Sequence, residues 1–357
     1  MTSPPHPSTA RTRRSRLARV ARWTVIVLVV LALIGAATNA WLERLDDARF
    51  PPPGLLVSVG DHRLHLYCTG EGSPTVVLDA GLGGWSIGSE RIRRALTDSV
   101  RVCVYDREGL GWSEGGSGPY DIATSARELR GLLLAANVPL PVVLVGHSLG
   151  ANIAGYYAAT YRDDVVGAVL LDPGTPEDML EDFKGSETDA RQLTGCGWRC
   201  AAAVVAGDLG LARLALHLVF PGTKQFSARE NAMYLAGLSR ARALQAMAGA
   251  LAFLPKSAIE FRDARSFGDT PLTVIYSGNT RKPSDAETPA DVAAWHGLTL
   301  ERMRGLVAGS TRGRGPLVVP GVTHTTLVFD SASVALIASE VLRLVRLPDG
   351  RSPSSVR

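Results

Sequence analysis

Pro-Val-Val-Leu-Val-Gly-His-Ser-Leu-Gly-Ala occupies residues 141–151 of the 357-residue chain. Residues 142–145 form a short β-branched, apolar run of the kind that is buried on both faces in a parallel sheet. Residues 151–159 are mostly small and apolar, which predicts a closely packed helix. Between the two segments Ser148 lies in a G-x-S-x-G pattern, and a strand, a sharp turn and a helix are the context in which this pattern forms a nucleophile elbow.

The elbow constrains the backbone around Ser148. Its turn is strained, and side chains larger than those of Gly146 and Gly150 would collide with the neighbouring strand and helix. The turn holds the serine hydroxyl above the edge of the sheet, at the positive end of the following helix, where an oxyanion can be stabilised. We therefore take Ser148 as the candidate nucleophile.

The segments on either side of the elbow predict the α/β fold class. Apolar runs that are typical of strands alternate with helical segments such as 122–137 and 332–345. This alternation predicts a mostly parallel sheet that is flanked by helices on both faces. The predicted strands are 55–59, 62–67, 76–79, 101–105, 142–145, 165–171, 271–277 and 316–319.

The predicted core comprises residues 55–173 and 269–346, with an insertion over residues 174–268. The insertion is rich in alanine and leucine and contains no convincing strand. A helical insertion between sheet strands is typical of a lid. We expect residues 347–357 to be a disordered tail.

Basic residues are concentrated at the N-terminus. Residues 1–22 contain six arginines and no acidic residue, and without them the net charge of +4 would be slightly negative. The net positive charge of the chain therefore does not indicate a nucleic-acid partner. The apolar segment 23–42 is long enough to span a bilayer, and the cationic arm predicts a cytoplasmic N-terminus with the remainder outside the cytosol. A cleaved signal peptide, which would release a secreted protein, is the alternative. We expect residues 43–54 to form a linker.

Four cysteines in a chain outside the cytosol suggest disulfides. The first pairing to test joins Cys68 to Cys103 and Cys196 to Cys200, with four buried free thiols as the alternative. No histidine lies near Cys196 and Cys200, so we expect no metal site there.

A base and an acid complete the candidate triad. A serine needs a base, and His324 lies just after the last predicted strand, at the sheet edge where catalytic groups of α/β sheets gather. The acid that would orient this histidine has two candidates. Asp172 ends the strand after the elbow, whereas Asp285 stands eight residues beyond the predicted strand 271–277. We favour Asp172 and keep Asp285 as the alternative.

The oxyanion hole is expected to use two backbone N–H groups. One belongs to Leu149, the residue after the nucleophile. The second is expected from the glycine-rich loop that follows the predicted strand 76–79, where Leu82 lies between Gly81 and Gly83.

These motifs resemble the α/β-hydrolase fold family over about residues 55–346. The resemblance rests on the elbow 146–150, on Tyr-Asp-Arg-Glu-Gly-Leu-Gly-Trp-Ser at 105–113 and on the late His324. It is closest to the serine-hydrolase branch that includes esterase-like and prolyl-iminopeptidase-like members. The resemblance implies Ser148 as nucleophile, His324 as base, and Leu82 with Leu149 as oxyanion donors. Many members carry the acid near Asp285, and others carry it at the position of Asp172. Two departures are Ala80-Gly81, where the family has His-Gly in the oxyanion loop, and Ala151 after the elbow.

The sequence thus predicts a membrane-anchored serine hydrolase that acts on a carboxylic ester or a related small acyl substrate, without a metal or organic cofactor. The insertion favours an ester because it is apolar and shows no acid cluster that would bind a free amino terminus. Aminopeptidase-like or cofactor-independent perhydrolase activity on the same residues is the alternative within the class. A ligand-binding protein without catalysis is the alternative outside it. The apolar residues of the insertion that favour an ester are Leu211, Leu214, Leu216, Leu218, Val219 and Phe220.

Overall fold

The computed structural model describes residues 9–180, 183–219, 223–278 and 288–347. An eight-stranded sheet with the strand order β1-β2-β4-β3-β5-β6-β7-β8 forms its centre. The strands β3 to β8 run parallel to one another, and β1 and β2 add an antiparallel edge. The strands are β1 (Leu55–Val59), β2 (His62–Thr69), β3 (Val76–Asp79), β4 (Val102–Tyr105), β5 (Val142–His147), β6 (Val165–Leu171), β7 (Leu272–Ser277) and β8 (Gly313–Val319). The predicted α/β class and mostly parallel sheet are confirmed.

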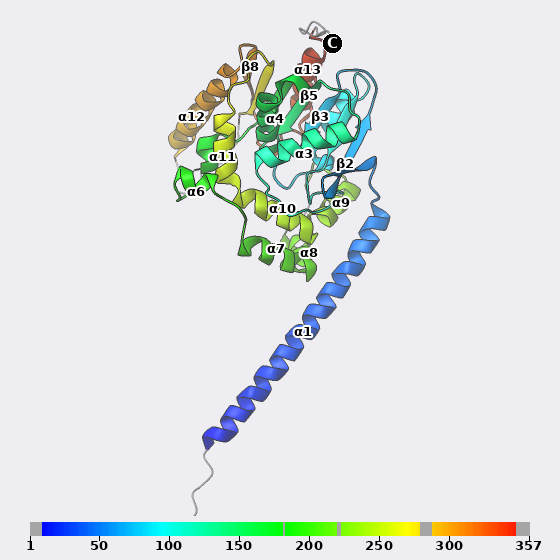
Figure 1. Cartoon of the computed structure of the whole chain (residues 1–357), viewed down its shortest axis with the longest axis vertical. Coiled ribbons are helices and arrows are strands. Elements are labelled where there is room, and N and C mark those ends of the chain that lie inside the picture. The colour runs from blue at the N-terminus through cyan, green and yellow to red at the C-terminus, as the bar shows by residue number, and fades with distance from the viewer. Residues whose placement is uncertain (1–8, 181–182, 220–222, 279–287, 348–357) are drawn as a thin grey trace, which may run out of the picture.

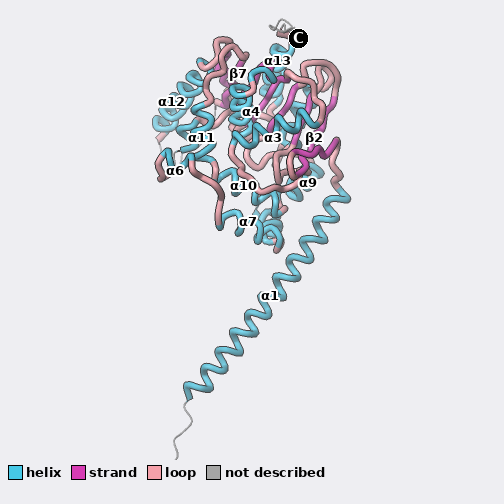
Figure 2. The backbone as a smooth tube through the Cα atoms, in the orientation of Figure 1, coloured by secondary structure: helices cyan, strands magenta, loops and turns pink. Residues whose placement is uncertain are grey.

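Helices cover both faces of this sheet (Figure 2). One buried cluster joins the sheet to α3 (Ile122–Ala135), α4 (Leu149–Thr160), α11 (Leu254–Asp263) and α12 (Pro289–Ala308). A second cluster joins the opposite face to α2 (Glu90–Leu96) and α13 (Ser331–Val345). The strands are therefore buried on both sides, as their β-branched composition predicts. Two short 3₁₀ helices lie at Ser86–Ser89 and Arg162–Asp164.

Helices make up the insertion between β6 and β7, and its described residues contain no strand. Its helix α10 packs on the core, where Ala243 and Ala246 join Trp85 and Leu110 in a third buried cluster. The described helices of the insertion are α5 (Pro176–Leu180), α6 (Glu187–Arg191), α7 (Trp198–Asp208), α8 (Leu211–Val219), α9 (Ala228–Leu238), α10 (Ala241–Ala252) and α11. We refer to residues 174–268 as the lid segment.

The N-terminal segment forms one helix, α1 (Thr9–Arg49), which projects from the globular part (Figure 1). Residues 16–49 of this helix are long and apolar enough to cross a bilayer, and a signal sequence has the same properties. The helix continues through residues 43–49, which we expected to belong to a linker. No glycine or proline interrupts this part of the chain before Pro51, and its charged residues form ion pairs with the lid segment. The expected tail lies mostly beyond the described residues.

Candidate active site

Ser148 lies between β5 and α4 in a backbone conformation with φ 56° and ψ −123°. The flanking glycines make this turn sterically possible. A Cβ at Gly146 would lie 2.1 Å from the carbonyl oxygen of Gly150, and a Cβ at Gly150 would lie 2.5 Å from that of Ala80. Both distances are well below van der Waals contact, so the turn requires glycine at both positions. The strand, turn and helix therefore occur where the sequence predicts them.

The glycine-rich loop after β3 lies against this turn. A Cβ at Gly81 would lie 3.2 Å from the Cβ of Ser148, so the loop approaches the serine closely. Leu82 follows in the same loop, and Leu149 begins α4 directly after the serine. The two residues that we expect to supply oxyanion N–H groups thus come from two segments that meet beside Ser148.

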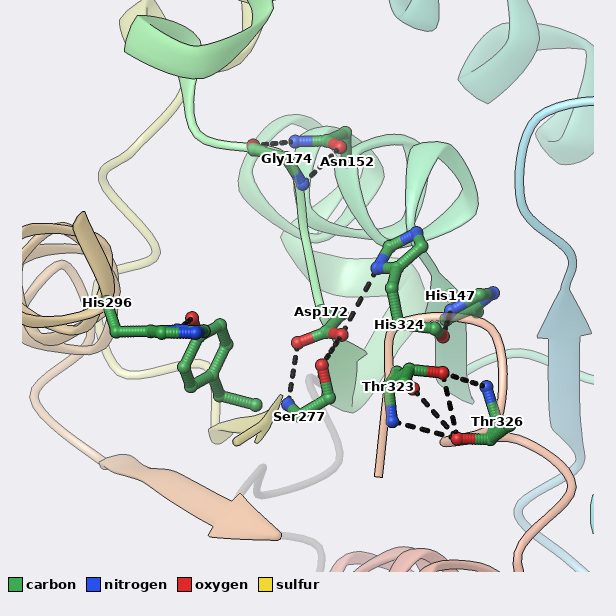
Figure 3. Close-up of polar contacts among 10 residues, drawn as sticks. His147, Asn152, Asp172, Gly174, Ser277, His296, Thr323, His324 and Thr326 are labelled. Atoms are coloured by element: carbon green, nitrogen blue, oxygen red, sulfur yellow. Dashed lines mark hydrogen bonds and ion pairs between the residues drawn. The ribbon is translucent and has the colours of Figure 1, made fainter. Parts of the chain in front are cut away.

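His324 and Asp172 are brought together across the sheet edge, from the loop after β8 and from the end of β6 (Figure 3). The Nδ1 atom of His324 lies 3.1 Å from Oδ2 of Asp172. The aspartate side chain is buried, whereas the histidine side chain is 41% exposed. This is the arrangement in which a carboxylate fixes the tautomer of an imidazole and stabilises its protonated form.

Ser277, at the end of β7, holds the Asp172 carboxylate in place (Figure 3). Its backbone N–H donates to Oδ1 at 2.8 Å, and its hydroxyl donates to Oδ2. The backbone N–H of Asp172 donates to the carbonyl of Ile275 at 2.9 Å. The sequence analysis did not identify Ser277. The signal that could have identified it is its position as a serine at the end of the predicted strand 271–277, which lies next to the strand that ends before Asp172.

A pocket of about 500 Å³ opens in front of Ser148 and His324. Its wall is largely apolar and includes Ile92, Val328 and Phe329. The lid segment contributes Thr223, Phe226 and Tyr234. The pocket is large enough for a substrate of several hundred Å³.

The lid residues on which we based the preference for an ester do not line this pocket in the described part of the chain. Leu211, Leu214, Leu218 and Val219 are exposed on α8, so the apolar character of this helix does not itself support the preference for an ester. Phe220 lies outside the described residues. Helical amphipathicity alone does not tell which face of a lid helix meets the core.

Comparison with known proteins settles the family. The model of the alpha/beta hydrolase family matches residues 76–339, about three quarters of the chain.

The chain belongs to the alpha/beta hydrolase family.

Individual relatives are more distant. An uncharacterized protein of Bacillus subtilis, YqjL, is 36% identical over 138 residues, which cover 38% of this chain and 49% of YqjL. The putative carbamate hydrolase RutD of Klebsiella pneumoniae is 41% identical over 101 residues, which cover 28% of this chain and 37% of RutD. The chain thus spans about half or less of these curated relatives. A thermophilic esterase from Thermogutta terrifontis superposes with a TM-score of 0.57 at 20% identity, covering 82% of this chain and 99% of the esterase, which shows a shared fold.

The alternative acid of this alpha/beta hydrolase, Asp285, lies outside the described residues. The structure therefore shows a contact for Asp172 and says nothing of Asp285. The assignment of the acid stays a prediction, and we return to its test in the Discussion.

His147 is a second histidine beside the site, which the sequence analysis treated only as the neighbour of Ser148. Its Nε2–H donates to the carbonyl oxygen of His324 at 3.0 Å, and the two rings are 4.8 Å apart. Burial, together with the nearby His324, lowers the pKa of His147 to about 4. His147 is therefore neutral at ordinary pH, and it helps to position the loop that carries His324 without adding a charge there.

Arg107 contacts the glycine-rich loop after β3, in which this chain has Ala80-Gly81. The guanidinium donates to the carbonyl oxygens of Ala80 and Gly81, each at 2.5 Å. It also pairs with the Asp79 carboxylate, to which the hydroxyl of Tyr105 donates at 2.8 Å. Burial raises the pKa of Asp79, and the charge of Arg107 acts in the opposite direction. The planar fork of arginine thus links one buried carboxylate to two consecutive loop carbonyls.

We predict that Arg107→Lys lowers kcat about 10–100-fold with little change in KM, because the single ammonium nitrogen of lysine cannot take both positions from which the two guanidinium nitrogens bond the loop and Asp79, and the loop would shift by a fraction of an ångström. Steady-state kinetics on a soluble ester measures both constants. The matched control is Arg94→Lys, because Arg94 is an exposed arginine that pairs with Glu90. Equal kcat values for Arg107→Lys and the parent would show that the fork has no role in catalysis.

A separate cluster lies beyond the oxyanion loop. His62, Glu108 and Glu128 bring one potential metal-ligand atom each to within 4.8 Å of one another. Burial, together with the charge of Glu108, raises the pKa of Glu128 to about 7. Glu128 is therefore partly protonated near neutral pH, which lowers the negative charge of this cluster. The sequence analysis did not identify the cluster, because its members come from β2, the loop after β4 and α3.

The four cysteines form two disulfides in the structure. Cys68 and Cys103 are cross-strand partners on β2 and β4, with their Cα atoms 4.0 Å apart. Cys196 and Cys200 are joined in the lid segment, with their Cα atoms 5.7 Å apart. These are the two pairs that the sequence analysis put first.

Proposed function

We propose that this alpha/beta hydrolase cleaves an acyl ester through Ser148, His324 and Asp172. The observation that carries the proposal is the contact between His324 and Asp172 at the mouth of the pocket that Ser148 lines. A base that is oriented by a buried carboxylate, beside a serine on a strained turn, is the geometry required for nucleophilic catalysis by serine.

The proposed reaction has two halves. Ser148 Oγ attacks the carbonyl carbon while His324 accepts its proton, and the backbone N–H groups of Leu82 and Leu149 stabilise the oxyanion. The C–O bond to the alcohol then breaks, and the alcohol leaves with the proton from His324. In the second half, His324 removes a proton from water, whose oxygen attacks the acyl carbon. The bond from this carbon to Ser148 Oγ then breaks, the proton passes from His324 to Oγ, and the carboxylic acid leaves. Asp172 stabilises the imidazolium in both halves.

The pocket favours an ester over a peptide with a free amino terminus. Asp79 is the carboxylate among the described residues that line the pocket, and Arg107 and Tyr105 already bind it. The pocket therefore offers no free negative charge to an ammonium group, whereas its apolar wall suits an acyl chain. The names of the relatives, an esterase among the structures and a carbamate hydrolase among the sequences, agree with acyl transfer.

We also propose that α1 anchors the chain in a membrane, with the catalytic part outside the cytosol. The C-terminal part of α1 is integrated with the lid segment. Asn39 is buried, and its amide donates to the carbonyl of Gly207 at 3.0 Å and accepts from Arg213 at 3.2 Å. Cleavage near Ala40 would remove these contacts, which favours retention of the helix over release of a secreted protein.

Turnover of matched substrates tests the ester proposal. The full chain in detergent micelles is expected to hydrolyse p-nitrophenyl butyrate at least about 10²-fold faster than alanine p-nitroanilide, because the described pocket lining offers no free carboxylate to the ammonium group of the anilide. Equal rates would favour the aminopeptidase-like alternative. Absence of turnover on both substrates, in a protein that unfolds cooperatively, would favour the non-catalytic alternative.

A further inference from the structure

The outer face of the lid segment carries an apolar surface that the pocket does not use. We call it the outer lid surface, and it belongs to α7 and α8, which meet at an 82° bend. Leu218, Val219 and Trp198 are 78%, 77% and 77% exposed. An apolar surface of this kind on a folded protein marks an interaction site rather than ordinary solvent contact. The outer lid surface comprises Trp198, Val205, Leu211, Leu214, Leu218 and Val219.

The contacts of α1 place this surface relative to the membrane-crossing segment. The carbonyl oxygen of Leu209, in the turn between α7 and α8, would lie 2.7 Å from a Cβ at Gly35. Arg213 on α8 pairs with Asp46 at 2.8 Å. The lid thus packs along α1 from Gly35 to Asp46, on the side from which the free length of α1 projects (Figure 1).

Gly35 lies inside the apolar segment 23–42, which would span the hydrocarbon core. It precedes Leu42 by seven residues, or about 10 Å along a helix. A turn that touches Gly35 therefore lies at or below the outer surface of the bilayer. Asp208 in the same turn is exposed, and a carboxylate is costly in the hydrocarbon core, which limits the depth to the interface.

Two residues that line the pocket of Ser148 lie close in sequence to the outer lid surface. Val219 ends α8, and Thr223 and Phe226 line the pocket a few residues later. The opposite wall of that pocket is apolar, with Ile92, Val328 and Phe329. The lid segment that carries the outer lid surface therefore also forms part of the pocket wall.

We infer that the outer lid surface rests on the bilayer that α1 enters, and that the substrate is a long-chain ester taken from this bilayer. The inference rests on the proposed function, since it names the substrate class of the same site. Burial of the leucine, valine and tryptophan side chains of this surface among the lipid acyl chains holds the lid at the interface.

The test uses the full chain in phosphatidylcholine nanodiscs and a double variant, Leu214→Glu with Leu218→Glu. Two carboxylates on this face are expected to lift the lid from the bilayer, and to lower hydrolysis of a fluorogenic long-chain ester in the nanodisc at least about 10-fold. Hydrolysis of soluble p-nitrophenyl butyrate should stay within about two-fold, because neither leucine lines the pocket. The matched control is Leu298→Glu, an exposed leucine on α12, on the far side of the core.

A spectroscopic measurement checks the surface independently of activity. The difference in tryptophan fluorescence between the parent protein and Trp198→Phe gives the emission of Trp198. Nitroxide-labelled lipids should quench this emission. Equal loss on both esters, loss on neither, or an unquenched Trp198 would overturn the inference. Hydrolysis of the soluble ester without hydrolysis of the bilayer ester would overturn it and leave the proposed function standing. If the parent hydrolyses neither ester, the proposed function fails, and the quenching alone reports on the surface.

Discussion

Ser148→Ala is expected to lower ester hydrolysis at least about 10⁴-fold, the largest effect of any single substitution in this chain. Without the hydroxyl no acyl-enzyme forms, and the oxyanion hole and pocket alone supply only the residual acceleration over water. Initial rates on p-nitrophenyl butyrate, with thermal unfolding as a check on folding, measure the effect. The fold should survive because alanine is smaller than serine.

The matched control for this variant is Ser89→Ala. Ser89 lines the same pocket, and no histidine among the described residues hydrogen-bonds to its side chain. Its activity is expected to stay within about two-fold of the parent. A Ser148→Ala protein with more than about 1% of the parental rate would show that another nucleophile operates.

Asp172→Asn is expected to reduce kcat about 10⁴-fold while leaving the pocket intact. Asparagine preserves the shape of the side chain, but its amide can donate to Nδ1 of His324. The proton of the imidazole then moves to Nε2, and the ring cannot accept the proton of Ser148. Steady-state kinetics should show the loss in kcat and a KM close to that of the parent.

Comparison of the kcat values of Asp172→Asn and Asp285→Asn identifies which aspartate is the acid. We expect this second variant to keep kcat within about two-fold, because the contact with His324 at 3.1 Å belongs to Asp172. Loss of activity in Asp285→Asn with retention in Asp172→Asn would reverse the assignment and place the acid after β7.

The elbow was predictable because all of its determinants are local. The apolar strand, the two glycines and the small residues of α4 lie within twenty residues of one another, and each is required by the turn that it forms. Strand β8 was predicted too short, from 316 instead of Gly313, because it is an edge strand whose first residues are exposed and polar. Such residues carry no apolar pattern from which a strand can be predicted.

Contacts between distant segments could not be predicted in the same way. Both Asp172 and Asp285 follow a strand of the sheet, and the sequence does not tell which of them lies beside His324. Ser277 and Arg107 act through hydrogen bonds to residues 105 and 26–28 positions away, and nothing in the local pattern marks them. The direction in which α8 turns its leucines also depends on the packing of the lid against α1.

Labelling with a fluorophosphonate tests the central claim, an activated Ser148, most directly. Trypsin releases residues 131–162 as a peptide in which Ser148 is the one serine, so mass spectrometry assigns the modified residue without ambiguity. The account predicts one phosphonate on this peptide in the full chain and none in Ser148→Ala. A folded parent protein that takes up no label, or a label that persists elsewhere in Ser148→Ala, would contradict it.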